Sequence, residues 1–152
     1  MKRVVILGRG GAGKSTLAQE LSHALELPVI ELDSIFWQRD LRPAPEPDWA
    51  EIQRELVARD RWIIDGDLGP YDAGLGLRLR EADTIIVLDY PLWRCVWQAL
   101  RRSRETCEFW TWVYRYRRDS LPTTTKAIAS HAPHATVHIF HNPRQVRRFI
   151  DS

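Results

Sequence analysis

A glycine-rich segment that joins an apolar run to a helical pattern constrains this chain more than any other feature of its sequence. Residues 3–7 form a short β-branched apolar run, which is typical of a buried parallel strand. Residues 8–13 interrupt this run, and leucines recur every fourth residue after Lys14, as in an amphipathic helix. A strand, a glycine-rich turn and a helix in immediate succession predict an α/β unit whose turn faces a ligand.

Residues 8–15, which we call the phosphate loop, match the pattern G-x-x-x-x-G-K-[ST] in the strand-to-helix context that this pattern requires. Glycines let successive backbone N–H groups point at an anion, and the positive end of the helix adds to the field. In this arrangement Lys14 reaches the β- and γ-phosphates, Ser15 is a Mg²⁺ ligand and Thr16 lies by the α-phosphate. A chance glycine-rich turn is disfavoured, because composition, spacing and context agree. We therefore predict that a nucleoside triphosphate is bound by Gly8, Gly10, Gly11, Ala12, Gly13, Lys14, Ser15 and Thr16.

Strand and helix patterns alternate along the rest of the chain. Apolar, β-branched runs predict strands at 28–32, 62–64, 84–88 and 135–140. Helical patterns predict a helix capped by Asp48, where Glu51 completes a capping box, and helices at about 92–121, 123–130 and 143–150. This alternation predicts a parallel sheet covered on both faces, with ligands beyond the carboxyl ends of the strands.

Size and composition predict a single soluble domain. The chain has 152 residues, of which 44% are apolar and 28% charged, and no stretch approaches the ~20 apolar residues that span a bilayer. The first residues carry no signal-peptide pattern. Two cysteines, Cys95 and Cys107, are too few for a disulfide framework in a domain of this size, so we expect reduced thiols. We also expect a cytoplasmic location and no membrane association.

Charge is distributed unevenly along the sequence. Residues 1–90 carry 11 basic and 16 acidic side chains, a balance of −5, whereas residues 91–152 carry 11 basic and 4 acidic ones, a balance of +7. Nearly all the basic side chains are arginines, which bind phosphate groups through paired hydrogen bonds. The basic second half therefore fits either polyphosphate chemistry or a nucleic-acid-binding surface.

Further motifs narrow the class of triphosphate-binding protein. The Asn-Lys-x-Asp motif of GTPases is absent, and the chain is shorter than motors and helicases. Beyond the phosphate loop the chain carries Leu32-Asp33 with Phe36-Trp37, Trp62-Ile63-Ile64-Asp65-Gly66, Ala82-Asp83-Thr84-Ile85-Ile86, Leu88-Asp89-Tyr90-Pro91, Trp112 and Tyr116-Arg117-Arg118. With these motifs, nearly the whole chain resembles the adenylate kinase-like nucleotide kinases, and most closely the bacterial DNA topology modulation proteins.

The resemblance implies a fold and a reaction. The fold is a three-layer P-loop NTPase of the nucleotide-kinase type, with a five-stranded parallel sheet of order 2-3-1-4-5. One kinase domain would span residues 1–152, with a short acceptor-side insertion at about 33–60 and a vestigial lid at about 102–112. The reaction is transfer of the γ-phosphoryl group of Mg-ATP to a nucleotide or similar small acceptor, which depends on positioning and charge neutralisation more than on a strong base.

The resemblance also implies a metal site at the end of the third strand. Asp65 would act with Ser15 as a ligand of Mg²⁺ or of its waters, and Asp67 is a second-rank candidate for the same role. The alternative for Asp65 is a cap of the turn at Gly66.

Two residues are implied on the acceptor side. Asp33 would face the acceptor and accept a hydrogen bond from its hydroxyl group, unless it only caps the segment that follows. Arg78 would face the same pocket and bind a phosphate or carboxylate of the acceptor. The alternative for Arg78 is a surface ion pair with Glu81.

Arginines are implied around the transferring phosphate. By its spacing from Pro91, Arg102 best matches the family arginine that contacts the phosphates from the base of the lid. Arg118, with Arg115 and Arg117, would supply a second clamp from the returning helix. A solvated helix face is the alternative for part of this cluster.

Three positions concern the rest of the nucleotide site. Asn142 lies in the segment 141–144, which corresponds to the loop that wraps adenine with backbone in the family. Arg9, inside the phosphate loop, is expected to face solvent or to touch the γ-phosphate. Gln98 replaces an arginine that stacks on adenine in adenylate kinases, so base selectivity stays open.

The lid and its tryptophans depart from the family pattern. Only residues 105–109 separate Arg104 from Trp110, and so short a lid would exclude water poorly and favour slow turnover or leakage of ATP hydrolysis. Trp93 and Trp97 are four residues apart and are expected in a helix–helix core. A hydrophobic wall in place of the lid, or a dimer contact, is the alternative.

The sequence thus predicts an ATP-dependent, Mg²⁺-using small-molecule kinase that is a monomer or a homodimer. The alternative is an ATP-binding or weakly hydrolytic regulatory protein associated with DNA, which the basic second half and the short lid would fit. Nucleic acid as a partner is not favoured over a small acceptor.

Overall fold

Five parallel strands form the sheet at the centre of the protein. The computed structural model describes residues 1–9, 11–36, 46–67, 74–102 and 107–152. Every pair of neighbouring strands is parallel, which confirms the predicted sheet and its order, β2-β3-β1-β4-β5. The strands are β1 (Arg3–Gly8), β2 (Val29–Glu31), β3 (Trp62–Asp65), β4 (Thr84–Leu88) and β5 (Thr136–Phe140).

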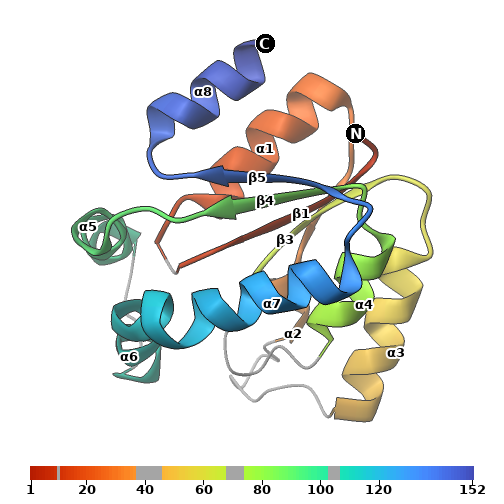
Figure 1. Cartoon of the computed structure of the whole chain (residues 1–152), viewed down its shortest axis with the longest axis horizontal. Coiled ribbons are helices and arrows are strands. Elements are labelled where there is room, and N and C mark those ends of the chain that lie inside the picture. The colour runs from red at the N-terminus through yellow and green to blue at the C-terminus, as the bar shows by residue number, and fades with distance from the viewer. Residues whose placement is uncertain (10, 37–45, 68–73, 103–106) are drawn as a thin grey trace.

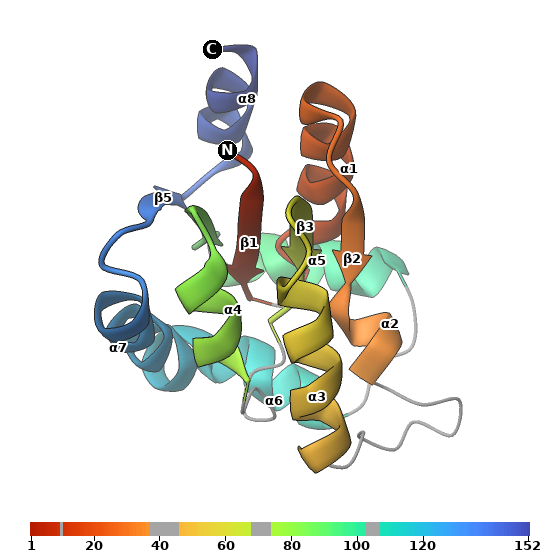
Figure 2. The ribbon, with the colours of Figure 1, turned by 90° about the vertical axis from the view of Figure 1, so that its right-hand side faces the viewer.

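Helices cover both faces of the sheet and its carboxyl edge (Figures 1 and 2). One face carries α1 (Lys14–Leu25) and α8 (Pro143–Asp151), and the other carries α3 (Glu46–Val57), α4 (Leu75–Glu81) and α7 (Leu121–His131). The short α2 (Leu32–Phe36) follows β2. Beyond the ends of the strands lie α5 (Leu92–Arg102) and α6 (Cys107–Arg115), and a π-helical segment, η2 (Tyr116–Ser120), joins α6 to α7. Within the described ranges, no helix has the length and apolar character needed to cross a membrane.

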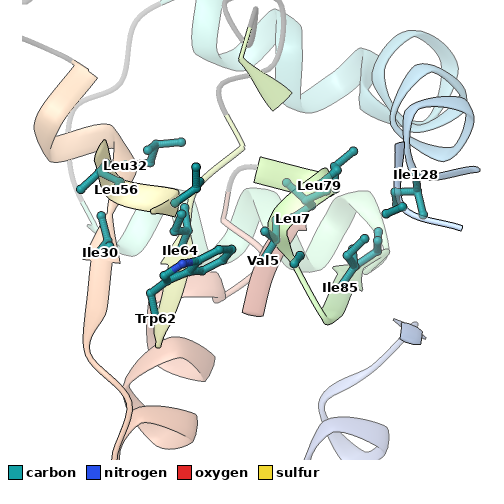
Figure 3. Close-up of a cluster of buried hydrophobic side chains, with 14 of the residues drawn as sticks. Val5, Leu7, Ile30, Leu32, Leu56, Trp62, Ile64, Leu79, Ile85 and Ile128 are labelled. Carbon is teal, nitrogen blue, oxygen red and sulfur yellow. The ribbon is translucent and has the colours of Figure 1, made fainter. Parts of the chain in front are cut away.

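Two apolar cores follow from the alternation of side chains along the strands. In β1, Val4 and Ile6 pack toward α1 and α8, whereas Val5 and Leu7 pack toward α3, α4 and α7, and all four are fully buried. Figure 3 shows the second core, where the Trp62 side chain lies beside the strand residues. Strands covered on both faces need continuous apolar runs, which is why β1, β3 and β4 are the clearest strands in the sequence.

Several predicted helix boundaries are wrong, each for a local reason. The helix expected to be capped by Asp48 begins at Glu46, and Pro47 lies in its first turn, where its missing N–H leaves nothing unpaired. The helix expected over 92–121 is divided into α5, α6 and η2. The helices α2 and α4 were not predicted, because 5 and 7 residues are too few to show a period.

Helix α5 turns its tryptophans outward, so the prediction that Trp93 and Trp97 pack in a core is wrong. Their side chains are 70% and 62% exposed, and the small residues Cys95 and Ala99 are buried instead. The reason is the close approach of α5 to the phosphate loop, where a Cβ at Gly11 would overlap the carbonyl oxygen of Cys95. An inward-facing tryptophan would not fit at this separation.

This close approach predicts different costs for two glycine substitutions. Gly11 and Gly13 both have left-handed backbone, with φ of +78° and +87°, so alanine at either position should lower the free energy of unfolding by about 1–2 kcal/mol. Gly11→Ala should cost more, because a Cβ at Gly13 meets only the side chain of Gln98, at 3.5 Å. Urea denaturation of the two variants measures the difference, and equal costs would contradict the tight packing of α5 on the loop.

Candidate functional site

The phosphate loop lies at the carboxyl end of β1 and leads into α1, at the edge of the sheet where α5 passes (Figure 1). The Lys14 ammonium donates to the carbonyl oxygens of Gly8, at 3.1 Å, and Arg9, at 3.2 Å, so it is held across the loop. A cation at the N-terminus of a helix suits a polyphosphate. Gly10 lies outside the described residues, and the loop brings together the other predicted nucleotide-binding residues, Gly8, Gly11, Ala12, Gly13, Lys14, Ser15 and Thr16.

Ser15 and Asp65 are in direct contact. The Ser15 hydroxyl donates to Oδ2 of Asp65 at 2.7 Å, and Asp65 is buried at the end of β3. Parallel pairing explains the contact, because Ile6 of β1 pairs with Asp65 and the two strands end side by side. Hydroxyl and carboxylate oxygens are ligands that Mg²⁺ accepts, and this ion usually takes its other ligands from water and phosphates. The pair therefore fits a Mg²⁺ ion held next to a triphosphate.

Asp67 has a different environment from Asp65. Its Oδ2 accepts hydrogen bonds from the backbone N–H of Gly8, at 3.3 Å, and from the hydroxyl of Tyr116, at 3.2 Å. Burial raises the pKa of Tyr116 far above its ordinary value, and the neighbouring Asp67 carboxylate adds to the shift, so the hydroxyl stays protonated and donates. Asp67 thus anchors the start of the phosphate loop. Sequence reasoning missed Tyr116 as a site residue, because its helical stretch shows no pattern that separates it from core.

Arg9 does not face solvent, which corrects the prediction for this residue. Its side chain is only 3% exposed, and its guanidinium donates to the carbonyl oxygen of Tyr90 at 3.4 Å and lies 5.8 Å from the centre of the Tyr116 ring. The same guanidinium lies close to Cys95, whose pKa is raised by burial although Arg9 and Lys14 lower it, so this thiol is protonated and inert. Arg9 therefore extends from the loop into the interior of the protein, where it contacts Tyr90 and Tyr116.

The structure separates the arginines that the sequence grouped together. The side chain of Arg118 is 81% exposed and lies 3.9 Å from Asp119, and its role as a second clamp stays a prediction. Arg117 points to the sheet edge instead, where its Nε lies 2.8 Å from Asp89 Oδ1. The side chain of Arg102, at the end of α5, lies outside the described residues. Neighbouring positions on a helix face different directions, so the sequence shows the cluster and does not show the direction of each arginine.

The segment after β5 joins the same edge. Asn142 is the N-cap of α8, and its side chain accepts from the Gln145 backbone N–H at 3.1 Å, while Gln145 accepts from the backbone N–H of His141 at 2.7 Å. His141 Nδ1 lies 3.3 Å from Asp89 Oδ2. The Asn142 side chain is thus committed to the helix cap, and contact between this segment and a base stays a prediction.

The acceptor side is only partly described, because 37–45 and 68–73 lie outside the described residues. Asp33 lies in the first turn of α2 and is exposed. Arg78 is fully buried in α4, and its guanidinium donates to Oε1 of Gln53 at 2.7 Å. The surface ion pair proposed as an alternative for Arg78 is wrong, because Arg78 is buried and Glu81 contacts Arg3 at 3.2 Å.

Comparison with known sequences gives one limited match. No family model matches the chain. The shikimate kinase of Rhodococcus erythropolis is 33% identical over an alignment 113 residues long, and the match covers 66% of this chain and 64% of that protein. The match therefore spans a little less than two thirds of the curated relative.

Comparison with solved structures shows the fold over the whole chain. The shikimate kinase from Acinetobacter baumannii in complex with shikimate has a TM-score of 0.67 at 15% identity, over 99% of this chain and 89% of that one. A gluconokinase from Sinorhizobium meliloti has a TM-score of 0.61 at 14% identity, over 99% and 87%. The chain thus has the fold of these small-molecule kinases, as predicted. The closer resemblance to DNA topology modulation proteins stays a prediction.

The loop geometry predicts the effect of removing its lysine. Lys14→Ala should abolish binding of a fluorescent ATP analogue and leave the thermal midpoint nearly unchanged, because the ammonium contacts only carbonyls of the loop among the described residues. The matched control is Lys126→Ala, on the exposed side of α7. Retention of full affinity by Lys14→Ala would overturn the assignment of the loop.

Proposed function

We propose that this protein is an ATP-dependent kinase that transfers the γ-phosphoryl group of Mg-ATP to a hydroxyl group of a small acceptor. The observation that carries the proposal is the contact between Ser15 and Asp65 beside Lys14, at 2.7 Å. A metal-binding pair and a phosphate-binding cation at one loop form the donor half of a phosphoryl-transfer site.

Each proposed site residue has a separate role in the transfer. Lys14 and the backbone of the loop hold the β- and γ-phosphates, and Ser15 and Asp65 hold the metal, which neutralises charge on the bridging oxygens. Asp33 accepts the hydrogen bond of the attacking hydroxyl and orients it toward the γ-phosphorus. Arg102, at the end of α5, supplies positive charge as the phosphoryl group leaves. Positioning and charge account for the rate, because phosphoryl transfer needs little covalent help from the protein.

The acceptor is proposed to be a small hydroxylated metabolite. The curated relative is a shikimate kinase, and proteins with the same fold include a gluconokinase and a sugar kinase. Asp33, which is exposed, supports this assignment, since a carboxylate suits a substrate with hydroxyl groups. Nucleoside monophosphates are the second class of acceptor to consider.

A coupled assay of ADP release tests the proposal directly. The purified chain is given Mg-ATP alone, and then with shikimate, gluconate, hexoses, nucleosides or nucleoside monophosphates in turn. The expected result is that one class of acceptor stimulates ADP release at least about tenfold. A slow background of ATP hydrolysis is expected without acceptor, because a short lid excludes water poorly. No stimulation across the panel, with ATP bound, would overturn the kinase assignment.

A second candidate function is a regulatory ATP-binding protein that contacts nucleic acid. The observation that favours it is the exposed pair Trp93 and Trp97 on α5, a helix whose described part carries arginines and no acidic residue. Aromatic rings beside arginines suit stacking against single-stranded bases. Steeply salt-dependent binding of single-stranded DNA that is lost in Trp93→Ala/Trp97→Ala would support this candidate, and absence of binding at low salt would remove it.

The proposed role of Arg102 predicts a specific kinetic signature. Arg102→Ala should lower kcat by about a hundredfold or more and change ATP affinity little, because its charge is needed as the phosphoryl group leaves. Arg147→Ala, on an exposed position of α8, is the control. Steady-state kinetics and ATP titration separate the two effects, and an unchanged kcat would assign this role to another arginine.

A further inference from the structure

A buried polar cluster lies beneath the phosphate loop, and the proposed reaction does not use it. Asp67, Tyr116 and Arg9 are all buried, although they come from three distant parts of the chain. One oxygen of Asp67 accepts both from the Gly8 backbone N–H, at 3.3 Å, and from the Tyr116 hydroxyl, at 3.2 Å. The carboxylate therefore joins the first residue of the loop to the segment that returns from α6.

The charges in this cluster explain why it holds together. A buried carboxylate is costly unless it is hydrogen-bonded and lies near a positive charge. Among the described residues, Gly8 and Tyr116 donate hydrogen bonds to Asp67, and the Arg9 guanidinium lies 5.8 Å from the centre of the Tyr116 ring. Tyr116 thus contacts Asp67 through its hydroxyl and faces Arg9 through its ring, and removal of the hydroxyl would take one donor from the carboxylate.

Gly8 links this cluster to the catalytic lysine. Its N–H is held by Asp67, and its carbonyl oxygen accepts from Lys14 at 3.1 Å. A shift of this single residue would move both the first peptide of the loop and the support of the ammonium group. The cluster therefore acts on the part of the loop that would meet the β- and γ-phosphates.

The segment that carries Tyr116 is itself fixed to the sheet edge. Tyr116 is the first residue of the π-helical segment η2, and the next residue, Arg117, lies 2.8 Å from Asp89 at the end of β4. Short π-helical segments inside helices are frequent at functional sites, because they redirect side chains. Here η2 directs two consecutive side chains to the ends of two strands, and so ties the end of α6 to the loop.

We propose that Tyr116 is a positioning residue, which sets the conformation of the phosphate loop through Asp67 and Gly8 and so tunes its affinity for a triphosphate. The effect on affinity rests on the proposed function, whereas the effect on the loop does not. Arg9 completes the cluster by placing its guanidinium over the ring of Tyr116. Tyr116 acts through other residues and does not touch the phosphates.

The test compares two tyrosines that are two positions apart. Tyr116→Phe removes only the hydroxyl, and Tyr114→Phe is the matched control, because Tyr114 is 73% exposed. Amide exchange of Gly8 is measured by NMR without nucleotide, and affinity is measured with a fluorescent ATP analogue. In Tyr116→Phe, exchange at Gly8 should rise and affinity fall by roughly tenfold each, since a hydrogen bond to a charged group is lost. Tyr114→Phe should change both by less than about twofold.

A double-mutant cycle gives a readout that a merely structural role would not produce. Asp67→Asn keeps an acceptor oxygen and should weaken affinity less than Asp67→Ala does. Tyr116→Phe combined with Asp67→Ala should be no worse than Asp67→Ala alone, because both act through one interaction. Additive losses, or faster amide exchange over the whole sheet, would overturn the proposal, as would an unchanged Gly8 in Tyr116→Phe. If the wild-type chain binds no triphosphate while Gly8 still responds, the proposed function fails and the effect on the loop stands.

Discussion

The parallel pairing of β1 with β3 and β4 is the constraint on which the rest of the structure depends. Ile6 pairs with Asp65 and Gly8 with Leu88, so all three strands end at the same edge of the sheet. Residues far apart in the sequence reach that edge as a geometric consequence, and β3 and β4 each add a carboxylate there or just beyond it. A register shift of one residue would turn these side chains to the other face of the sheet, and the site residues would no longer lie together.

The carboxylates at this edge differ in the groups that donate hydrogen bonds to them. Asp65 meets the hydroxyl of Ser15, Asp67 holds the backbone N–H of Gly8, and Asp89 binds the segment that follows α6. One carboxylate thus meets the hydroxyl that is its predicted partner at a metal site, and two others hold the start of the phosphate loop and the segment after α6 in place.

Close contact between α5 and the phosphate loop has a second consequence. Small residues must face the loop, so Trp93, Trp97 and Leu100 of α5 are left on its outer side. Trp93 and Trp97 looked like core residues from their spacing, and periodicity does identify one face of the helix. Periodicity does not say which face meets the protein when the backbones approach closely. The misassignment of these tryptophans and of Arg9 has this common cause, since both depend on how near two backbones come.

The sequence by itself determined the parallel sheet and the phosphate loop, because these rest on local patterns: apolar runs buried on both faces, and glycines at fixed spacing before a helix. The strand order and the pairing of Ser15 with Asp65 came from the resemblance to known kinases. Tertiary structure decided that Arg9 is buried, which carboxylate anchors the loop and where Tyr116 lies. Those choices depend on the π-helical segment after α6 and on contacts between residues about 50 positions apart in the chain. No periodic pattern encodes such contacts, because each is fixed by the packing of one element against another.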